Sequence, residues 1–215
     1  MSLGIYEKIL DLCKRLHSKN MLAAADGNIS YRFHDERIVI TPSGKAKAFM
    51  AEDDLARITL SGRVLEGHPS GESSMHLEVY RRCPKAKAVV HAHPPTAIAW
   101  TLARPDLEEL EGECLPEVIL AAGKIPIASY ARPCTEEMAR AIRPFLPTRK
   151  LMILARHGAL SWGESLEEAY RGMERLEHCA QILKAAHELG GAKKLPALEI
   201  EALMAMREKM GHKTL

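Results

Sequence analysis

Two histidines stand two residues apart at the end of an apolar run, in the segment VVHAHPP. The run predicts a strand, in which side chains at positions i and i+2 point to the same face. The imidazoles of His91 and His93 can therefore converge on one ion, as a metal site requires. Taken alone, the pattern is also typical of a polar strand end, so a metal site needs a third ligand.

His157 is the best candidate for that third ligand, because it ends the buried run LMILAR and precedes a glycine. Catalytic zinc usually has three protein ligands and keeps one position open. Four other histidines fall within helical patterns, where we interpret them as surface or groove residues, and three more fall in loops and receive no role. The helical ones are His17, His76, His178 and His187, and the loop ones are His34, His68 and His212.

Glu72 lies at the expected start of a helix, in the segment HPSGESSMH. A carboxylate at that position often only complements the positive end of the helix dipole. Near a metal ion it could instead carry a proton as a general acid or base. The residues alone leave both interpretations open.

Three short polar loops could bind an anion. The segments DGNIS (26–30), TPSG (41–44) and PSG (69–71) supply backbone N–H groups, hydroxyls or a carboxamide. Such groups can hold a phosphate, most easily at a helix N-terminus. Each loop is a common turn, but their combination with a candidate metal site is harder to attribute to chance.

Composition and charge exclude several classes of function. The 215 residues include 30 Lys and Arg against 28 Asp and Glu, and this balance gives no argument for a nucleic acid or a membrane as partner. The 5 cysteines are irregularly spaced and form no CxxC, which argues against a disulfide framework. The N-terminus lacks a signal-peptide pattern, and no apolar run approaches the roughly 20 residues that span a bilayer. We therefore expect a cytoplasmic protein.

Apolar periodicity and turn residues predict one α/β domain over residues 1–215, without repeats or linkers. Helices are expected near 4–19, 69–83, 94–103, 135–146 and 165–191, and from 193 into the tail, which ends in a few loose residues. Strands are expected near 29–33, 37–41, 56–60, 61–67, 87–93 and 124–130, and as a buried pair around a turn within 150–163. Thr135 and Ser165 are the expected N-caps of their helices.

The segments GNIS, ITPSG, PSGE, AVVHAHP and HGAL, in this order and at these spacings, resemble the class II aldolase/adducin family. The resemblance covers almost the whole chain, and within the family it is strongest to the small bacterial L-fuculose-1-phosphate aldolases. It implies a central, mainly antiparallel sheet flanked by helices. It also implies a homotetramer whose active sites lie between neighbouring subunits.

The resemblance further implies roles for individual residues. His91, His93 and His157 match three zinc ligands, and Glu72 matches the residue that binds the free metal and acts as acid or base with substrate. The positions that match a phosphate-binding site are Asn28, Ser43, Gly44, Ser70 and Gly71. The implied reaction cleaves a ketose 1-phosphate into dihydroxyacetone phosphate and an aldehyde, with one zinc ion per subunit as Lewis acid.

The chain departs from the fuculose-phosphate aldolases on the aldehyde side. They carry a tyrosine in the region matching 114–120, whereas this chain has none there and places Glu117 near that position. They use a second tyrosine in the tail, and the tail segment 206–215 has none. A related deoxyketose 1-phosphate is therefore as plausible a substrate as fuculose 1-phosphate. Two alternatives stay open: a methylthioribulose-1-phosphate dehydratase and a non-catalytic domain like that of adducin.

Overall fold

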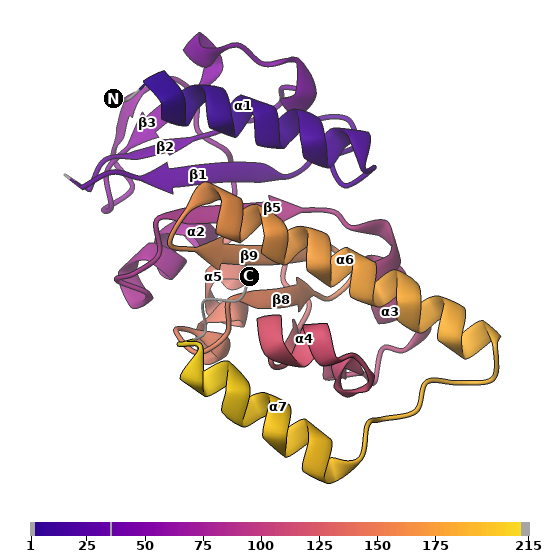
Figure 1. The fold of residues 1–215 in the computed structure, drawn as a ribbon. Helices are drawn as coiled ribbons and strands as arrows, with labels where there is room; N and C mark the ends of the chain where they lie inside the picture. The colour runs from indigo at the N-terminus through magenta and orange to yellow at the C-terminus, as the bar shows by residue number, and fades with distance from the viewer. Residues whose placement is uncertain (1–2, 35, 212–215) are drawn as a thin grey trace.

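A twisted sheet crosses the centre of the molecule and carries helices on both faces (Figure 1). The computed structural model describes residues 3–34 and 36–211. Within these residues the sheet has 9 strands in the order β4-β3-β2-β1-β5-β9-β8-β7-β6. The strands are β1 (Asn28–Arg32), β2 (Ile38–Ile40), β3 (Ala56–Ile58), β4 (Val64–Glu66), β5 (Ala88–Ala92), β6 (Glu109–Leu110), β7 (Ile125–Ala128), β8 (Leu151–Leu154) and β9 (Gly158–Gly163).

Neighbouring strands in this sheet run antiparallel, except that β7 and β8 are parallel. The prediction of a mainly antiparallel sheet flanked by helices, in a single α/β domain, is confirmed. The strand pair expected within 150–163 is the β8–β9 hairpin. The β3–β4 hairpin is also confirmed, and Gly62 takes a φ of 92° at its turn, a conformation that glycine adopts without strain.

The helices cover the two faces of the sheet unequally. One apolar core packs α1, α3, α4 and α6 against one face, and a second core packs α2 and α5 against the other. Helix α7 packs mainly on α4. The helices are α1 (Leu3–Ser18), α2 (Ser73–Arg82), α3 (Pro95–Ala103), α4 (Pro116–Ala121), α5 (Glu136–Ile142), α6 (Leu166–Glu188) and α7 (Ala197–Lys209).

Strand β5 lies between these two cores. Val90 faces the core under α6, and Val89 faces the core under α2. Because both faces of the strand are covered, its sequence does not alternate and is apolar except for His91. The central strand therefore holds its carboxyl end, which carries the paired histidines, in a fixed position.

Three elements differ from the prediction. Helix α4 and strand β6 were not expected, because six and two residues are too few to show a helical or a strand period. Helix α2 begins at Ser73 instead of near 69, because residues 69–72 form a loop. Thr135 and Ser165 cap their helices as expected, through bonds from Glu137 N and Glu168 N. The loose end expected for the tail lies mostly outside the described residues.

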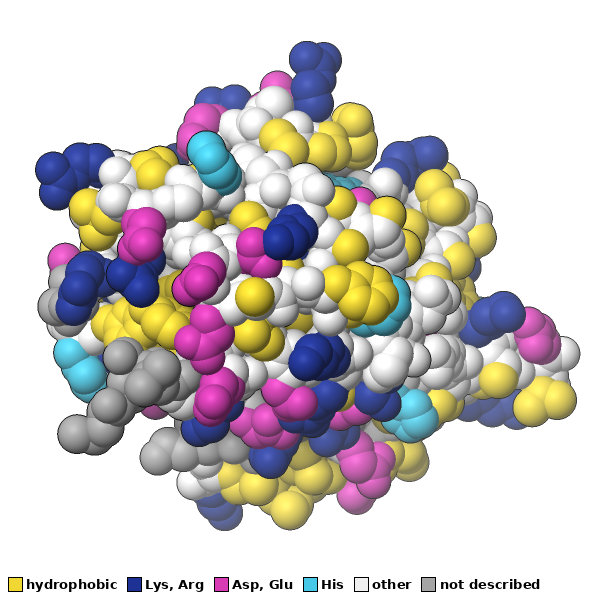
Figure 2. All heavy atoms as spheres, turned by 90° about the horizontal axis from the view of Figure 1, so that it is seen from above, with side chains coloured by type: hydrophobic (Ala, Val, Ile, Leu, Met, Phe, Trp, Pro, Cys, Tyr) yellow, Lys and Arg dark blue, Asp and Glu magenta, His cyan; other side chains and the backbone are white. Residues whose placement is uncertain are grey.

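Charges of both signs are interspersed over the face shown in Figure 2. That face carries no continuous basic region of the kind that binds a phosphate backbone. Across residues 3–34 and 36–211, no helix is both long enough and apolar enough to span a bilayer.

Candidate active site

The site forms where strands β1 and β5 meet the start of helix α2. Asn28 is the first residue of β1 and lies directly opposite His91 in the antiparallel ladder. Glu72 immediately precedes α2, which packs on the face of the sheet toward which Val89 of β5 points. Three segments far apart in the sequence therefore meet at one point.

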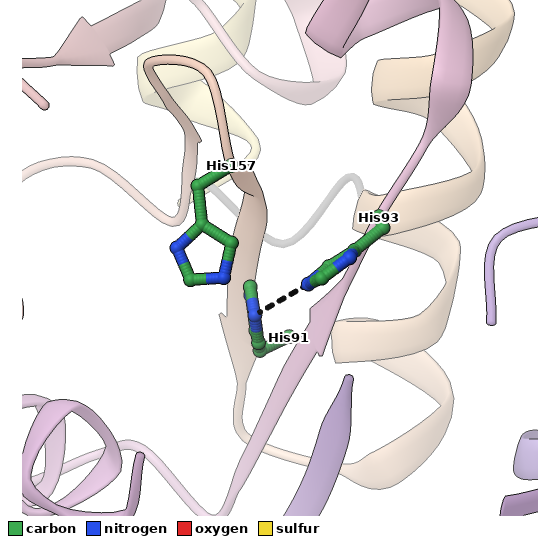
Figure 3. A group of neighbouring side chains, drawn as sticks. All are labelled: His91, His93 and His157. Atoms are coloured by element: carbon green, nitrogen blue, oxygen red, sulfur yellow. Dashed lines mark hydrogen bonds between the residues drawn. The ribbon is translucent and has the colours of Figure 1, made fainter. Parts of the chain in front are cut away.

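Three imidazole rings face one another at this point (Figure 3). The ring centroids of His91, His93 and His157 lie 5.0, 4.9 and 5.0 Å apart, and one nitrogen of each ring lies within 4.8 Å of the others. The Nε2 atoms of His91 and His93 are 3.2 Å apart. Two nitrogens bonded to one tetrahedral zinc at about 2.0–2.1 Å would lie about 3.3–3.4 Å apart. The group is therefore able to bind a metal ion.

The other nitrogens of two of these rings are engaged by the protein. Nδ1 of His91 lies 2.9 Å from the carbonyl oxygen of Ala159 and donates to it, and Nδ1 of His93 lies 3.4 Å from a carboxylate oxygen of Asp26. Partners of this kind fix the tautomer and leave the Nε2 lone pair for a metal. Burial, and then the neighbouring imidazoles, lower the pKa of His93 to about 4, so that its ring is neutral at pH 7.

Gly158 allows the third histidine to approach the other two. Residues 155–157 form the tight turn between β8 and β9, and Gly158 begins β9. A Cβ atom at Gly158 would lie 2.9 Å from a ring carbon of His91, 2.9 Å from a ring carbon of His93 and 2.5 Å from the carbonyl oxygen of Ala92. A larger residue at this position would therefore push the hairpin away from β5.

Glu72 turns its carboxylate toward the histidines. It is the N-cap residue of α2, yet its side chain makes no capping hydrogen bond. Its Oε2 lies 3.2 Å from Nε2 of His91, and its Oε1 lies 3.2 Å from Nε2 of His157. Burial alone would raise its pKa, but the close contacts with the His157 and His91 rings outweigh burial and hold the pKa well below its usual range. The carboxylate is therefore an anion beside the candidate metal site.

Asn28 connects this carboxylate to a buried histidine that the sequence analysis misplaced. Its Nδ2 donates to Oε2 of Glu72 at 2.7 Å and to Oγ of Ser70 at 3.0 Å. Its Oδ1 lies 2.5 Å from Nε2 of His76. The interpretation of His76 as a surface or groove residue was wrong, because α2 packs this ring against β1 and leaves it 0% exposed. The interpretation fits His178, which is exposed.

The predicted phosphate loops lie side by side. Pro42 and Pro69 form an isolated antiparallel bridge, and Ser70 N donates to the Thr41 carbonyl at 3.1 Å. Ser43 N donates to the carbonyl of His68 at 3.2 Å. These bonds join the loop after β2 to the loop before α2.

The two loops and the histidines line one pocket of about 310 Å³. Every predicted phosphate-site residue lies on its wall, together with the acidic residue and two of the histidines. These wall residues are Asn28, Ser43, Gly44, Ser70, Gly71, Glu72, His93 and His157. The structure thus brings the predicted residues together in space, while their roles remain predictions.

Lys47 also lines this pocket, and the sequence analysis gave it no role. A lysine in a polar loop carries no sequence signal, because such residues are usually solvated. Glu117 lies elsewhere: it is exposed on α4 and does not line the pocket. Its predicted role on the aldehyde side therefore depends on a neighbouring subunit and stays a prediction.

Comparison with known proteins places the chain in a family. Residues 7–183 match the profile of the class II aldolase and adducin N-terminal domain. The 5-deoxy-D-ribulose 1-phosphate aldolase of Bacillus thuringiensis serovar kurstaki is 30% identical and covers 95% of this chain and 96% of its own length. The 3-oxo-tetronate 4-phosphate decarboxylase of Escherichia coli O6:H1 is 30% identical, covering 84% of this chain and 86% of its own length.

A solved structure agrees with these sequence relatives. The L-fuculose-1-phosphate aldolase of Thermus thermophilus is 33% identical and superposes with a TM-score of 0.78, covering 89% of this chain and 98% of its own. With its histidine group and buried carboxylate, the chain therefore belongs to the class II aldolase and adducin family and is an enzyme of the metal-dependent class II aldolase type.

Proposed function

We propose that this enzyme cleaves a ketose 1-phosphate, such as L-fuculose 1-phosphate or a related deoxyketose 1-phosphate, into dihydroxyacetone phosphate and an aldehyde. The observation that carries the proposal is the position of Glu72, whose two oxygens each lie 3.2 Å from a nitrogen of the histidine group. A carboxylate in that position can contact a metal held by the histidines and can also reach a substrate bound there.

The donor set of this site fits zinc. Three imidazole nitrogens are the ligand set of many catalytic zinc sites, and the partners of Nδ1 in His91 and His93 leave Nε2 as the ligand atom. We propose that His91, His93 and His157 hold one zinc ion per subunit, with Glu72 as a further ligand before substrate binds. Zinc at this site would supply Lewis acidity toward the carbonyl oxygen of the ketose.

The loops of the pocket position the substrate. Asn28, Ser43 and Ser70 offer an amide and two hydroxyls, and Gly44 and Gly71 let backbone approach closely. We propose that they bind the phosphate of the dihydroxyacetone half. Holding that end fixes the carbon–carbon bond to be broken relative to Glu72, which lowers the entropic part of the barrier.

Glu72 is the proposed proton carrier. When the bond between C3 and C4 of the ketose breaks, the electron pair stays on C3 and the C4 hydroxyl loses its proton as the aldehyde forms. C3 then takes up a proton, and Glu72 is the carboxyl group placed to deliver it. Because the carboxylate is anionic at rest, it can accept the proton that the C4 hydroxyl loses and then give that proton to C3, so no net proton is gained or lost.

Decarboxylation of a 3-oxo-tetronate 4-phosphate is a second candidate function. There the bond between C1 and C2 breaks, carbon dioxide leaves, and the electron pair stays on C2 beside the carbonyl, so protonation again gives dihydroxyacetone phosphate. The observation that favours it is the lack of tyrosine in 114–120 and in 206–215, where an aldehyde would otherwise be handled. A relative with this activity in its name is 30% identical.

We also propose a cytoplasmic homotetramer in which the single domain of residues 1–215 shares each active site with a neighbour. The proposed specificity role of Glu117 would need this arrangement, because Glu117 is exposed and does not line the pocket of its own chain. The five cysteines are all free, which suits a reducing compartment.

The test is a panel of ketose 1-phosphates assayed for dihydroxyacetone phosphate, with 3-oxo-tetronate 4-phosphate and methylthioribulose 1-phosphate included. Release of dihydroxyacetone phosphate together with an aldehyde supports the aldolase. Its release together with carbon dioxide supports the decarboxylase. Loss of water from methylthioribulose 1-phosphate, without dihydroxyacetone phosphate, would replace both by a dehydratase. A metal-free protein inactive on every compound would favour a non-catalytic adducin-like domain.

A further inference from the structure

Lys47 is a buried cation at the edge of the candidate phosphate pocket. It begins a short 3₁₀ turn that follows the TPSG loop, and the residue is only 3% exposed. Its Nζ donates to the carbonyl oxygens of Ala25 at 2.8 Å and Lys45 at 2.7 Å. An ammonium has three donors, so two bonds to carbonyls leave one donor for another group.

Within the described residues, no carboxylate forms an ion pair with this ammonium. Asp26 and Glu72 act on it only as charges at longer range, and both face histidines of the candidate metal site. Burying a charge without an opposite charge is costly in free energy. The position therefore calls for an anion that the described chain does not supply.

Among the described residues that line the pocket, Lys47 is the only lysine or arginine, whereas Asp26 and Glu72, which both face the histidines, are acidic. The pocket's predicted phosphate contacts come from neutral groups, on Asn28, Ser43 and Ser70. A phosphate monoester carries a charge of about −1.5 to −2 near pH 7, and lysine binds such a group as a compact positive charge.

We infer that Lys47 is the counter-ion of the substrate phosphate, a binding residue beyond the neutral groups of the loops. This inference rests on the proposed function to the extent that the substrate carries a phosphate. Its tie to the carbonyls of Ala25 and Lys45 holds the ammonium in place before substrate arrives. The competing explanation is that Lys47 only ties two loops together.

The first arm of the test measures binding of inorganic phosphate by calorimetry at fixed ionic strength. Lys47→Gln keeps a donor for the carbonyls but removes the charge, and we expect the Kd for phosphate to rise about ten- to a hundredfold. Lys45→Gln is the matched control, because Lys45 pairs with Asp54 at the surface and does not line the pocket. Lys47→Met replaces the first variant if that variant fails to fold.

The second arm compares a cleavable ketose with and without its phosphate. A counter-ion role predicts that Lys47→Gln lowers kcat/KM for the phosphorylated compound alone, mainly through KM. If Lys47 only holds the two loops together, Lys47→Gln should lower kcat/KM equally for both compounds.

Three results would each overturn the inference. Lys47→Gln could lower kcat/KM equally for both compounds, it could leave the Kd for phosphate unchanged, or the wild type could bind no phosphate. If no ketose phosphate releases dihydroxyacetone phosphate, the proposed function fails. The calorimetric arm still decides the role of Lys47 in that case.

Discussion

Nε2 of His76 lies 2.5 Å from Oδ1 of Asn28, and this contact fixes the direction of a buried chain of hydrogen bonds. The Asn28 amide nitrogen must face the carboxylate of Glu72, which only accepts, so its oxygen faces His76 and Nε2 donates. Nδ1 of His76 then accepts from Oγ of Ser30 at 2.7 Å, and Ser30 accepts from the hydroxyl of Tyr80 at 2.7 Å. His76 therefore acts on the acidic residue through Asn28.

Replacing His76 by Phe should reduce turnover without removing the metal. The ring would still fill the buried space, but Asn28 would lose the partner that orients its amide toward Glu72. We expect kcat to fall about ten- to a hundredfold. This is the scale of one or two lost hydrogen bonds to a charged group, here the carboxylate of Glu72 that Asn28 contacts. Steady-state kinetics and metal analysis of the same preparation provide the test.

His178→Phe is the matched control, because His178 is an exposed histidine on α6 and should tolerate the change. A His76→Phe protein with normal kcat and normal metal content would show that the chain from Tyr80 to Glu72 has no part in turnover.

His76 should also make the protein less stable in mild acid. Burial lowers its pKa from 6.5 to about 3. The unfolded chain therefore binds the proton more readily, so the stability contributed by the neutral ring is complete above pH 6.5 and is lost as the pH falls toward 3. Between pH 8 and pH 5 this amounts to roughly 2 kcal/mol of unfolding free energy.

The measurement is urea unfolding of wild type and His76→Gln across that pH range. His93, whose pKa is also lowered, contributes to the slope in both proteins, so the difference between them isolates His76. Parallel curves for the two proteins would contradict the assignment.

The sequence predicted the His91–His93 pair because its geometry is local, whereas pairing of β5 with β9 brings His157 to it. A spacing of two residues on a strand aligns His91 with His93, and the turn at His157 follows from the hairpin pattern. His76 and Lys47 could not be placed in the same way. Each looks like a solvated residue in its own segment, and only packing against β1 or the 23–28 loop buries it.

Helix α4 illustrates the same limit for the fold. Its six residues are too short for a helical period, and its packing on α7 forms only once a distant part of the chain returns. If Glu117 acts across a subunit boundary as proposed, its surroundings depend on a second copy of the chain, which no pattern within one chain specifies.

Glu72→Gln should separate metal binding from catalysis. The three histidines remain, so the metal content should stay close to that of the wild type. Turnover should fall roughly 10²–10⁴-fold, the usual contribution of a positioned acid or base. Glu78→Gln is a useful control. It removes a nearby buried carboxylate, on α2, which pairs with Arg82 and Arg143 instead of the histidines. Equal turnover of the Glu72 variant and wild type on a verified substrate would exclude the role.

Gly158→Ala should weaken metal binding without touching a proposed ligand. The added methyl group would lie 2.9 Å from ring atoms of both His91 and His93, so the hairpin that carries His157 must shift. We expect a substantial loss of zinc after dialysis against a weak chelator, measured by elemental analysis. Gly4→Ala serves as control, since a Cβ at Gly4 meets nothing within 4 Å. Full zinc content in Gly158→Ala would show that the three rings need not converge as closely as they do here.

Phosphate recognition and aldehyde recognition should be separable in two further variants. Asn28 lies in the pocket and supports Glu72, and every candidate ketose 1-phosphate shares the half of the molecule that it would contact. Asn28→Ala should therefore lower kcat/KM for all of them by a similar factor, about tenfold to more than a hundredfold.

Glu117→Ala should instead change the ranking of substrates by their aldehyde portion, and only within an assembled tetramer, because Glu117 does not line the pocket of its own chain. Light scattering should accordingly give about four times the chain mass of 23.8 kDa. The test is kcat/KM for two ketose 1-phosphates that differ only at the far end, measured on both variants. If Asn28→Ala alters the ratio between the two substrates and Glu117→Ala leaves it unchanged, the two halves of the substrate have been assigned to the wrong residues. A fully active monomer would likewise rule out a role for Glu117 across a subunit boundary.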